Sequence, residues 1–186
     1  MKFTKMSLPD LILIEPDLHK DARGFFFEDY NKETFAAAGV LAEFVQDNHS
    51  LSNKGVLRGL HFQVSPRAQD KLVRVVRGEA FDVIVDVREG SKTLGKFVTT
   101  ALSAKNRKMI FIPEGFAHGF LALEDGTEFL YKVSRVYSAP HERGIAWDDP
   151  DLKIPWPKTG GRYFLSEKDG RHPSLKTFLK SARATG

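Results

Sequence analysis

The 186-residue chain contains no cysteine. Disulfide bonds, thiolate metal sites and cysteine nucleophiles are therefore excluded, and stability must come from packing. No stretch approaches the roughly 18 consecutive apolar residues of a membrane-spanning helix. The first ten residues, MKFTKMSLPD, also lack the apolar run of a signal peptide. We therefore expect a cytoplasmic protein with no membrane partner.

A strong charge of either sign is also missing, because 28 basic residues are nearly balanced by 24 acidic ones. The net charge of +4 is small and dispersed along the chain, so no nucleic-acid partner is indicated. A length of 186 residues is typical of one domain with a buried core. We expect a single domain over residues 1–186.

Long alanine-rich or leucine-rich stretches are few, whereas phenylalanine and glycine each occur 15 times, which favours strands joined by turns. A short helix is expected at 31–39, where Asn31 can cap the first turn and Gly39 can end the last, and another near 174–181. Residues from 139 onward are expected to form an ordered loop before that helix. Strands are expected at 11–15, 25–28, 56–63, 71–77, 80–87, 96–102, 109–112, 118–122 and 127–134.

Two motifs narrow the fold class. Gly-x5-His-x-Gln at 55–63 and Pro-Glu-Gly-x2-His at 113–118 match the two halves of the cupin pattern, so we expect a mainly β, cupin-type double-sheet jelly roll. Metal-binding cupins carry a second histidine where Gln63 stands here. His61 and His118 alone are fewer than the three or four protein ligands of a typical site, so no metal is expected.

The strand expected at 80–87 alternates clearly between two faces. Its odd-numbered residues from Phe81 to Val87 are apolar, whereas Asp82 and Asp86 lie on the opposite face. Carboxylates are seldom buried without a partner. We therefore expect both aspartates in solvent.

An arginine and a histidine occur together in the strand LRGLHFQ at 57–63. Strict alternation places Arg58 and His61 on opposite faces, but a bulge at Gly59 would bring them to the same one. A histidine beside a fixed cation is typical of proton chemistry on an anionic substrate. The alternative for His61 is a hydrogen-bonded place in the core.

Three further side chains are ambiguous when taken singly. Tyr131 lies on an apolar, inward face and is either a core aromatic or a functional phenol. Lys71 either extends to the rim of the fold or reaches a substrate anion. Asp169 is typical of a solvated turn or a helix cap, unless the fold brings it to a histidine.

Ordered motifs along nearly the whole chain, including DARGFFFE, QDNHS, LRGLHFQ, PEGFAHGFLAL, WDDPDLKIPWP and LSEKD, resemble the dTDP-4-dehydrorhamnose 3,5-epimerase family. The resemblance implies a metal-free jelly roll without a cofactor, acting as a homodimer on a dTDP-4-keto-6-deoxysugar. The expected reaction inverts C3 and C5 of dTDP-4-dehydro-6-deoxy-D-glucose and gives dTDP-4-dehydro-L-rhamnose.

The resemblance also implies roles for individual residues. His61 matches the general base, Asp169 the carboxylate that orients it, Tyr131 the general acid, and Lys71 the cation near the C4 oxygen of the sugar. The positions that hold the nucleotide sugar are Arg23, Phe26, Glu28, Gln46, Asn48, Arg58, Lys71, His118, Tyr137, Glu142 and Lys168.

Three other functions remain open. The nearest is an epimerase that inverts only C3 or only C5, which would use the same base and acid. A cupin that binds a sugar nucleotide without catalysis is the second, although a binding module has no need of an opposed base and acid. The third is a metal-dependent cupin oxygenase.

Overall fold

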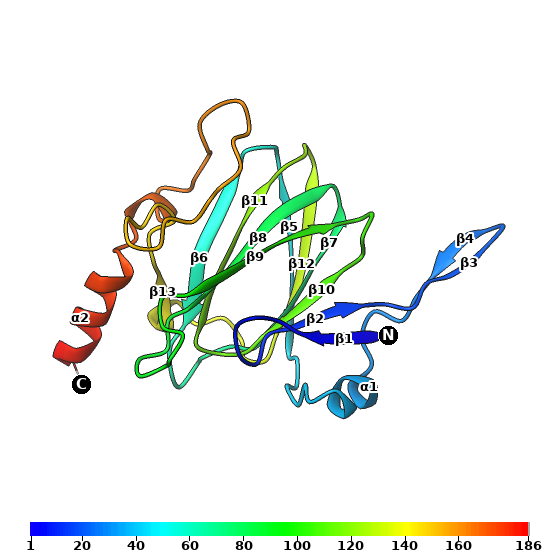
Figure 1. Cartoon of the computed structure of the whole chain (residues 1–186), viewed down its shortest axis with the longest axis horizontal. Helices are drawn as coiled ribbons and strands as arrows, with labels where there is room; N and C mark the ends of the chain where they lie inside the picture. Colours follow the sequence, from blue (N-terminus) through cyan, green and yellow to red (C-terminus); the bar gives the residue numbers. More distant parts are fainter. Residues whose placement is uncertain (186) are drawn as a thin grey trace.

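Two antiparallel sheets face each other in a computed structural model that describes residues 1–185 (Figure 1). The six-stranded sheet has the order β1 (Lys2–Lys5), β2 (Ile12–Glu15), β10 (Met109–Ile112), β7 (Lys71–Arg77), β12 (Thr127–Val133), β5 (Gln46–Ser52). The five-stranded sheet has the order β13 (Glu142–Gly144), β6 (Leu57–Gln63), β11 (Phe116–Ala122), β8 (Glu79–Asp86), β9 (Phe97–Ser103). The expected double-sheet fold of the cupin type is confirmed.

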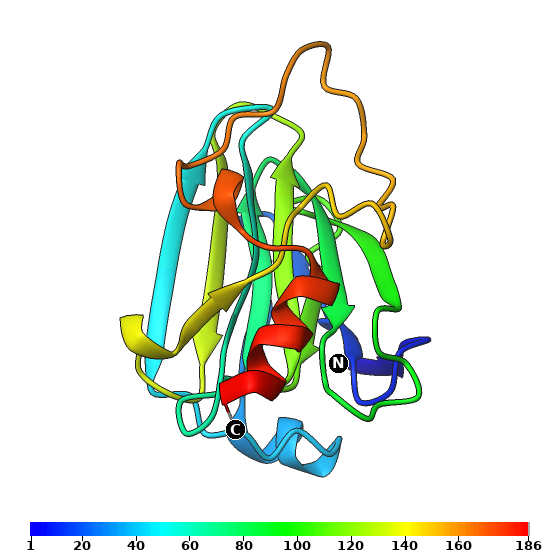
Figure 2. The ribbon, with the colours of Figure 1, turned by 90° about the vertical axis from the view of Figure 1, so that its left-hand side faces the viewer.

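Apolar side chains from both sheets pack between them, and each sheet is also covered on its outer face. Helix α1 (Lys32–Ala37) places Phe35 over the six-stranded sheet, against β2 and β10. The C-terminal segment and helix α2 (Leu175–Thr185) cover the outer face of the five-stranded sheet, where Leu175 packs near Val83 (Figure 2). Neither helix within residues 1–185 has the length and apolar character needed to cross a membrane.

Strand β8 corrects one expectation from the sequence. Its apolar odd-numbered residues face outward and are covered by the C-terminal segment. Asp82 and Asp86 are each 0% exposed, so the prediction that they are solvated is wrong. A strand covered on both faces buries both halves of an alternating pattern. Burial raises the pKa of Asp86, but hydrogen bonds from Arg88, Thr93 and Ser91 outweigh that effect and lower it to about 2.

Local signals placed α1 correctly. The Asn31 side chain accepts hydrogen bonds from the backbone amides of Glu33 and Thr34, as expected of a capping residue. The sequence did not predict strands β1, β3 (His19–Asp21), β5 and β13, and the last of these lies in the region expected to be loop. Helix α2 also extends beyond residue 181, where the sequence placed its end.

The N-terminal region also forms a hairpin that projects from the body of the fold (Figure 1). Its strands are β3 (His19–Asp21) and β4 (Gly24–Phe26), which pair only with each other among the described residues. Phe26, the last residue of β4, is 70% exposed. The hairpin therefore presents aromatic surface without a covering element from residues 1–185.

Candidate active site

A cleft of about 850 Å³ lies between the two sheets, with residues of the C-terminal segment along its edge. Strands β5, β7 and β12 line it from the six-stranded sheet, and β6 and β11 from the five-stranded one. The predicted site residues that line it are Gln46, Asn48, Arg58, His61, Lys71, His118, Tyr131, Tyr137, Glu142, Lys168 and Asp169.

Three predicted residues are not brought into this cleft. Arg23, Phe26 and Glu28 belong to the projecting hairpin and the residues just after it. The Arg23 guanidinium pairs with Asp21 of the same hairpin, and a separate cavity lies against the hairpin itself. Within one chain, these residues therefore form a surface apart from the cleft.

A bulge in β6 lets Arg58 and His61 line the same cleft. His61 lies opposite His118 of β11, whereas Arg58 lies opposite Phe120, so β6 has one extra residue between the two pairs. Gly59 occupies this bulge with φ of +142°, and a Cβ there would lie 2.5 Å from the Gly119 Cα. Glycine is required at this position because a side chain would collide with the neighbouring backbone.

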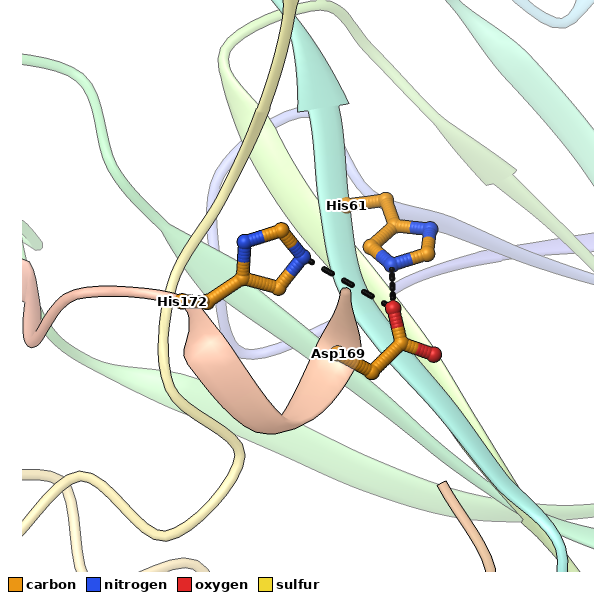
Figure 3. A group of neighbouring side chains, drawn as sticks. All are labelled: His61, Asp169 and His172. Atoms are coloured by element: carbon orange, nitrogen blue, oxygen red, sulfur yellow. Dashed lines mark hydrogen bonds and ion pairs between the residues drawn. The ribbon is translucent and has the colours of Figure 1, made fainter. Parts of the chain in front are cut away.

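His61 and Asp169 form a close pair at the edge of the cleft. His61 Nε2 lies 2.6 Å from Asp169 Oδ1 (Figure 3). Asp169 belongs to the 3-10 helix η2 (Asp169–Arg171), and its backbone amide donates to Ser166 Oγ. Burial raises the pKa of Asp169, but His61, Ser166 and His172 together outweigh burial and lower the pKa. With Nε2 held by the carboxylate, Nδ1 is the ring nitrogen that remains for a substrate.

A second histidine–carboxylate pair lies deeper in the cleft. His118 Nε2 lies 2.7 Å from Asp82 Oδ2, and both residues are buried. The two cupin histidines therefore bind different carboxylates. Reasoning from the sequence missed Asp82 because it treated the polar face of β8 as solvated. The available signal was His118. Its strand was expected from the sequence and pairs with β8, and its side chain faces the same interior as Asp82.

Lys71 supplies a buried cation in the cleft. It is 7% exposed, and its Nζ donates to the His61 carbonyl oxygen at 3.3 Å. Burial lowers the pKa of Lys71 to about 8, opposed by Glu142 and Asp82. At pH 7 the ammonium is therefore the main form, but it lies close to its titration range.

Tyr131 approaches the cleft from the other sheet. It belongs to β12 of the six-stranded sheet, whereas His61 belongs to β6 of the five-stranded sheet. Burial raises the pKa of Tyr131, although Arg58 opposes this effect. Its hydroxyl is therefore protonated at neutral pH and can donate a proton across the cleft from His61.

Polar side chains form a network at the mouth of the cleft. Glu142 accepts hydrogen bonds from the Tyr137 hydroxyl at 2.8 Å and from Lys168 Nζ at 2.7 Å. Gln46 accepts from the Tyr137 backbone amide and donates to Asn48. Burial raises the pKa of Glu142, but its two donors outweigh that effect and lower it. The mouth is thus lined by fixed donors and acceptors beside an aromatic ring.

A family model supplies the remaining observation. The model described as dTDP-4-dehydrorhamnose 3,5-epimerase matches residues 5–177. The chain belongs to this family.

Sequences and structures of other members of this epimerase family align with nearly the whole chain. The dTDP-4-dehydrorhamnose 3,5-epimerase of Pseudomonas aeruginosa is 54% identical over 170 residues, which are 91% of this chain and 93% of the relative. The crystal structure of the Legionella pneumophila dTDP-6-deoxy-D-glucose-3,5-epimerase in complex with dTDP-4-keto-L-rhamnose has a TM-score of 0.90. It is 43% identical and covers 94% of this chain and 93% of its own.

A second similar structure belongs to an enzyme with a different activity. ChmJ, a 3'-monoepimerase from Streptomyces bikiniensis in complex with dTDP-quinovose, has a TM-score of 0.90 and 32% identity. The match covers 95% of this chain and 89% of that one. The fold is therefore shared by double and single epimerases.

His172 is a further residue beside the site that sequence reasoning did not identify. Its Nε2 lies 3.7 Å from Asp169 Oδ1, and its ring meets that of His61 edge to face, with the centroids 5.4 Å apart (Figure 3). Burial and the nearby His61 lower the pKa of His172, so its ring is neutral at pH 7. Its spacing of three residues from Asp169 was the signal that could have indicated this contact.

Proposed function

We propose that the chain is an isomerase of dTDP-L-rhamnose biosynthesis that inverts C3 and C5 of dTDP-4-dehydro-6-deoxy-D-glucose. The product is dTDP-4-dehydro-L-rhamnose. One observation carries the proposal: a carboxylate-paired histidine and a protonated tyrosine enter the same cleft from opposite sheets. This arrangement suits removal of a proton from one face of a sugar ring and its return to the other.

The base chemistry follows from the C4 ketone of the substrate. Both C3 and C5 adjoin this carbonyl, so removal of either hydrogen gives an enolate. His61 Nδ1 accepts the proton, and Asp169 holds the opposite nitrogen at 2.6 Å, which fixes the tautomer and stabilises the imidazolium. A positioned base of this kind contributes roughly 10²–10⁴-fold to the rate.

Lys71 stabilises the enolate. The negative charge collects on the C4 oxygen, and a buried ammonium attracts it more strongly than a solvated one would. The mostly charged form of Lys71 at pH 7 suits this role. His118, hydrogen-bonded to Asp82, lines the same part of the cleft and contributes to holding the sugar.

Inversion requires that a proton arrive from the opposite face of the ring. His61 cannot supply it, because it removed the proton from its own side. Tyr131 belongs to the facing sheet and carries a proton at neutral pH. We assign Tyr131 as the general acid, and no cofactor is needed for either step.

The nucleotide lies toward the mouth of the cleft in this proposal. Arg58 donates to Ser52 Oγ and to the Leu51 carbonyl, and no carboxylate within residues 1–185 forms an ion pair with it. Its guanidinium is therefore available for the diphosphate. Tyr137 offers a ring for the base, and Gln46, Asn48, Glu142 and Lys168 supply further polar contacts.

We further propose a homodimer, because three predicted substrate contacts lie outside the cleft of their own chain. Arg23 and Phe26 are highly exposed on the projecting hairpin, and Glu28 follows it. A second copy would let each hairpin reach the other copy's cleft and cover its exposed aromatic surface. We also propose a cytoplasmic location, since a charged diphosphate sugar does not cross a bilayer unaided.

A second candidate is inversion at C3 alone, which the likeness to the 3'-monoepimerase favours. One experiment separates the two functions. The dTDP-4-keto sugar is incubated with enzyme in deuterated water, and proton NMR records which ring centres gain deuterium and change configuration. Deuterium and inversion at both C3 and C5 are expected. Change at C3 alone supports the second candidate, change at C5 alone supports neither function, and no isotope at either centre refutes the proposed chemistry.

A further inference from the structure

Three potential metal ligands converge beside the cleft (Figure 3). They are His61 from β6, Asp169 from η2, and His172 just after η2. One donor atom from each lies within 4.8 Å of the others. Both imidazole Nε2 atoms point toward the same carboxylate oxygen, at 2.6 Å for His61 and 3.7 Å for His172.

The position of His172 is not explained by hydrogen bonding. Its Nε2 is buried and has no hydrogen-bond partner in residues 1–185, since 3.7 Å to Asp169 is too long. The ring is also held firmly, because it lies over Gly144, where an added Cβ would meet several of its atoms. A buried, unpartnered nitrogen aimed at a carboxylate calls for an explanation.

We propose that His61, Asp169 and His172 form a binding site for a divalent transition-metal ion such as Zn²⁺, and that the bound ion inhibits the enzyme. Two imidazoles and one carboxylate match the preferences of zinc, and solvent can occupy the remaining position. The site uses none of the cupin metal positions except His61, and it depends on His172.

The geometry requires only a small rearrangement. Bonds of about 2.0–2.2 Å place neighbouring ligand atoms of a tetrahedral zinc site about 3.3–3.6 Å apart. The Asp169 and His172 atoms are already close to this separation at 3.7 Å. His61 and Asp169 must move apart from 2.6 Å, because the ion takes the place of the proton between them. The proton on Nε2 is lost and Nδ1 takes one up, so His61 stays neutral and binding of the ion releases no net H⁺.

An ion has a route to this site from outside the substrate cleft. A second cavity, of about 560 Å³, reaches His172 and Gly144 from the side of helix α2. Lys168 and Glu142 line both cavities and are paired with each other, so their charges largely offset. Bound substrate therefore does not block the approach of the ion.

Inhibition follows from the tautomer of His61 and rests on its proposed role as base. When Nε2 binds a metal, the proton of a neutral imidazole must be on Nδ1. Nδ1 is the nitrogen that must accept hydrogen from the sugar, so the base is blocked while the ion is bound. The expected effect is a lower kcat without a matching rise in KM.

The test begins with enzyme purified with chelator and then dialysed. Turnover is measured during Zn²⁺ titration, and binding is followed separately by calorimetry and by the visible spectrum of Co²⁺. His172→Gln removes one ligand. His49→Gln removes an exposed imidazole of β5 that lines neither of the two cavities. Each variant is compared with its own rate without metal. Inhibition of the wild type should weaken by at least about tenfold in His172→Gln, as expected for the loss of a ligand group, and persist in His49→Gln.

Several outcomes decide the proposal. Restoration of the wild-type rate by chelator supports it. Equal sensitivity of His172→Gln and the wild type would overturn the site, as would the absence of Co²⁺ and Zn²⁺ binding to the wild type. Binding that needs His172 but leaves turnover unchanged would overturn the inhibition, and with it the assignment of His61 as base. If His172→Gln does not fold, His172→Asn provides the same comparison.

Discussion

Replacing Asp169 with asparagine tests the central pair of the proposed mechanism. The substitution keeps the size of the side chain and removes its charge, 2.6 Å from His61 Nε2. If the amide nitrogen faces the ring, His61 is forced into the tautomer whose Nδ1 carries a proton and cannot act as base. If the amide oxygen faces the ring, the tautomer survives, but the anion that stabilises the imidazolium is lost. Both orientations slow proton removal.

The expected loss in kcat is about 10²–10⁴-fold, the range associated with general base catalysis and with comparable histidine–carboxylate pairs. It corresponds to about 3–5.5 kcal/mol at about 1.36 kcal/mol per decade. Deuterium incorporation measured by NMR follows proton removal directly, and calorimetry with dTDP measures nucleotide binding, which should change little. Asp169 contacts the base and not the nucleotide end of the cleft.

Ser166→Ala provides the matched control. It removes a hydroxyl that accepts from the Asp169 backbone amide and helps to lower the pKa of the carboxylate, but the carboxylate keeps its charge. A lost neutral hydrogen bond costs about 0.5–1.5 kcal/mol, which limits the expected rate loss to roughly tenfold. A near-normal exchange rate in Asp169→Asn, or an equal loss in both variants, would refute the reasoning that the charge of Asp169 activates His61.

Three further predictions concern Tyr131, Lys71 and Gly59. Tyr131→Phe should still exchange hydrogen for deuterium, because His61 remains, while product forms about 10²–10⁴-fold more slowly; equal loss of both would exclude Tyr131 as the acid. As pH rises through about 8, Lys71 loses its proton, so kcat/KM should fall. In Lys71→Arg this fall should move to higher pH, because arginine stays charged. An unchanged pH profile in that variant would contradict the role of Lys71. Gly59→Ala should lower the free energy of unfolding by about 2–5 kcal/mol in denaturant titrations, through backbone strain and overpacking. Gly161→Ala, where a Cβ has open space, should change it little.

The sequence was sufficient for features with local causes. Asn31 capping a helix and the two alternating faces of β8 depend on residues close together in the chain. Both appear in the structure, where Ile84 packs in the core between the sheets and Val83 packs under the C-terminal segment. The sequence also indicated that a bulge at Gly59 would bring Arg58 and His61 to the same face. Glycine in a strand often marks such a departure from regular pairing. The resemblance to the epimerase family identified the cleft residues on both sheets.

Features that depend on distant segments were less accessible. Asp82 was expected in solvent because the sequence does not reveal that the C-terminal segment covers the apolar face of β8. The contact of Asp169 with His61 joins residues 108 positions apart, and residues taken singly pointed to a solvated turn. Short strands such as β13 have too few residues for a hydrophobic pattern in the sequence. Strand β13 is defined by its pairing with β6.

The two-sheet architecture accounts for the stereochemistry of the proposed reaction. Inversion needs a base and an acid on opposite sides of one carbon, and a sandwich provides two inward faces that oppose each other. His61 on β6 and Tyr131 on β12 each occupy such a face. Because successive residues of a strand alternate in direction, moving the phenol to position 130 or 132 would turn it to the outer face. The capacity to invert therefore depends on strand register as much as on residue identity.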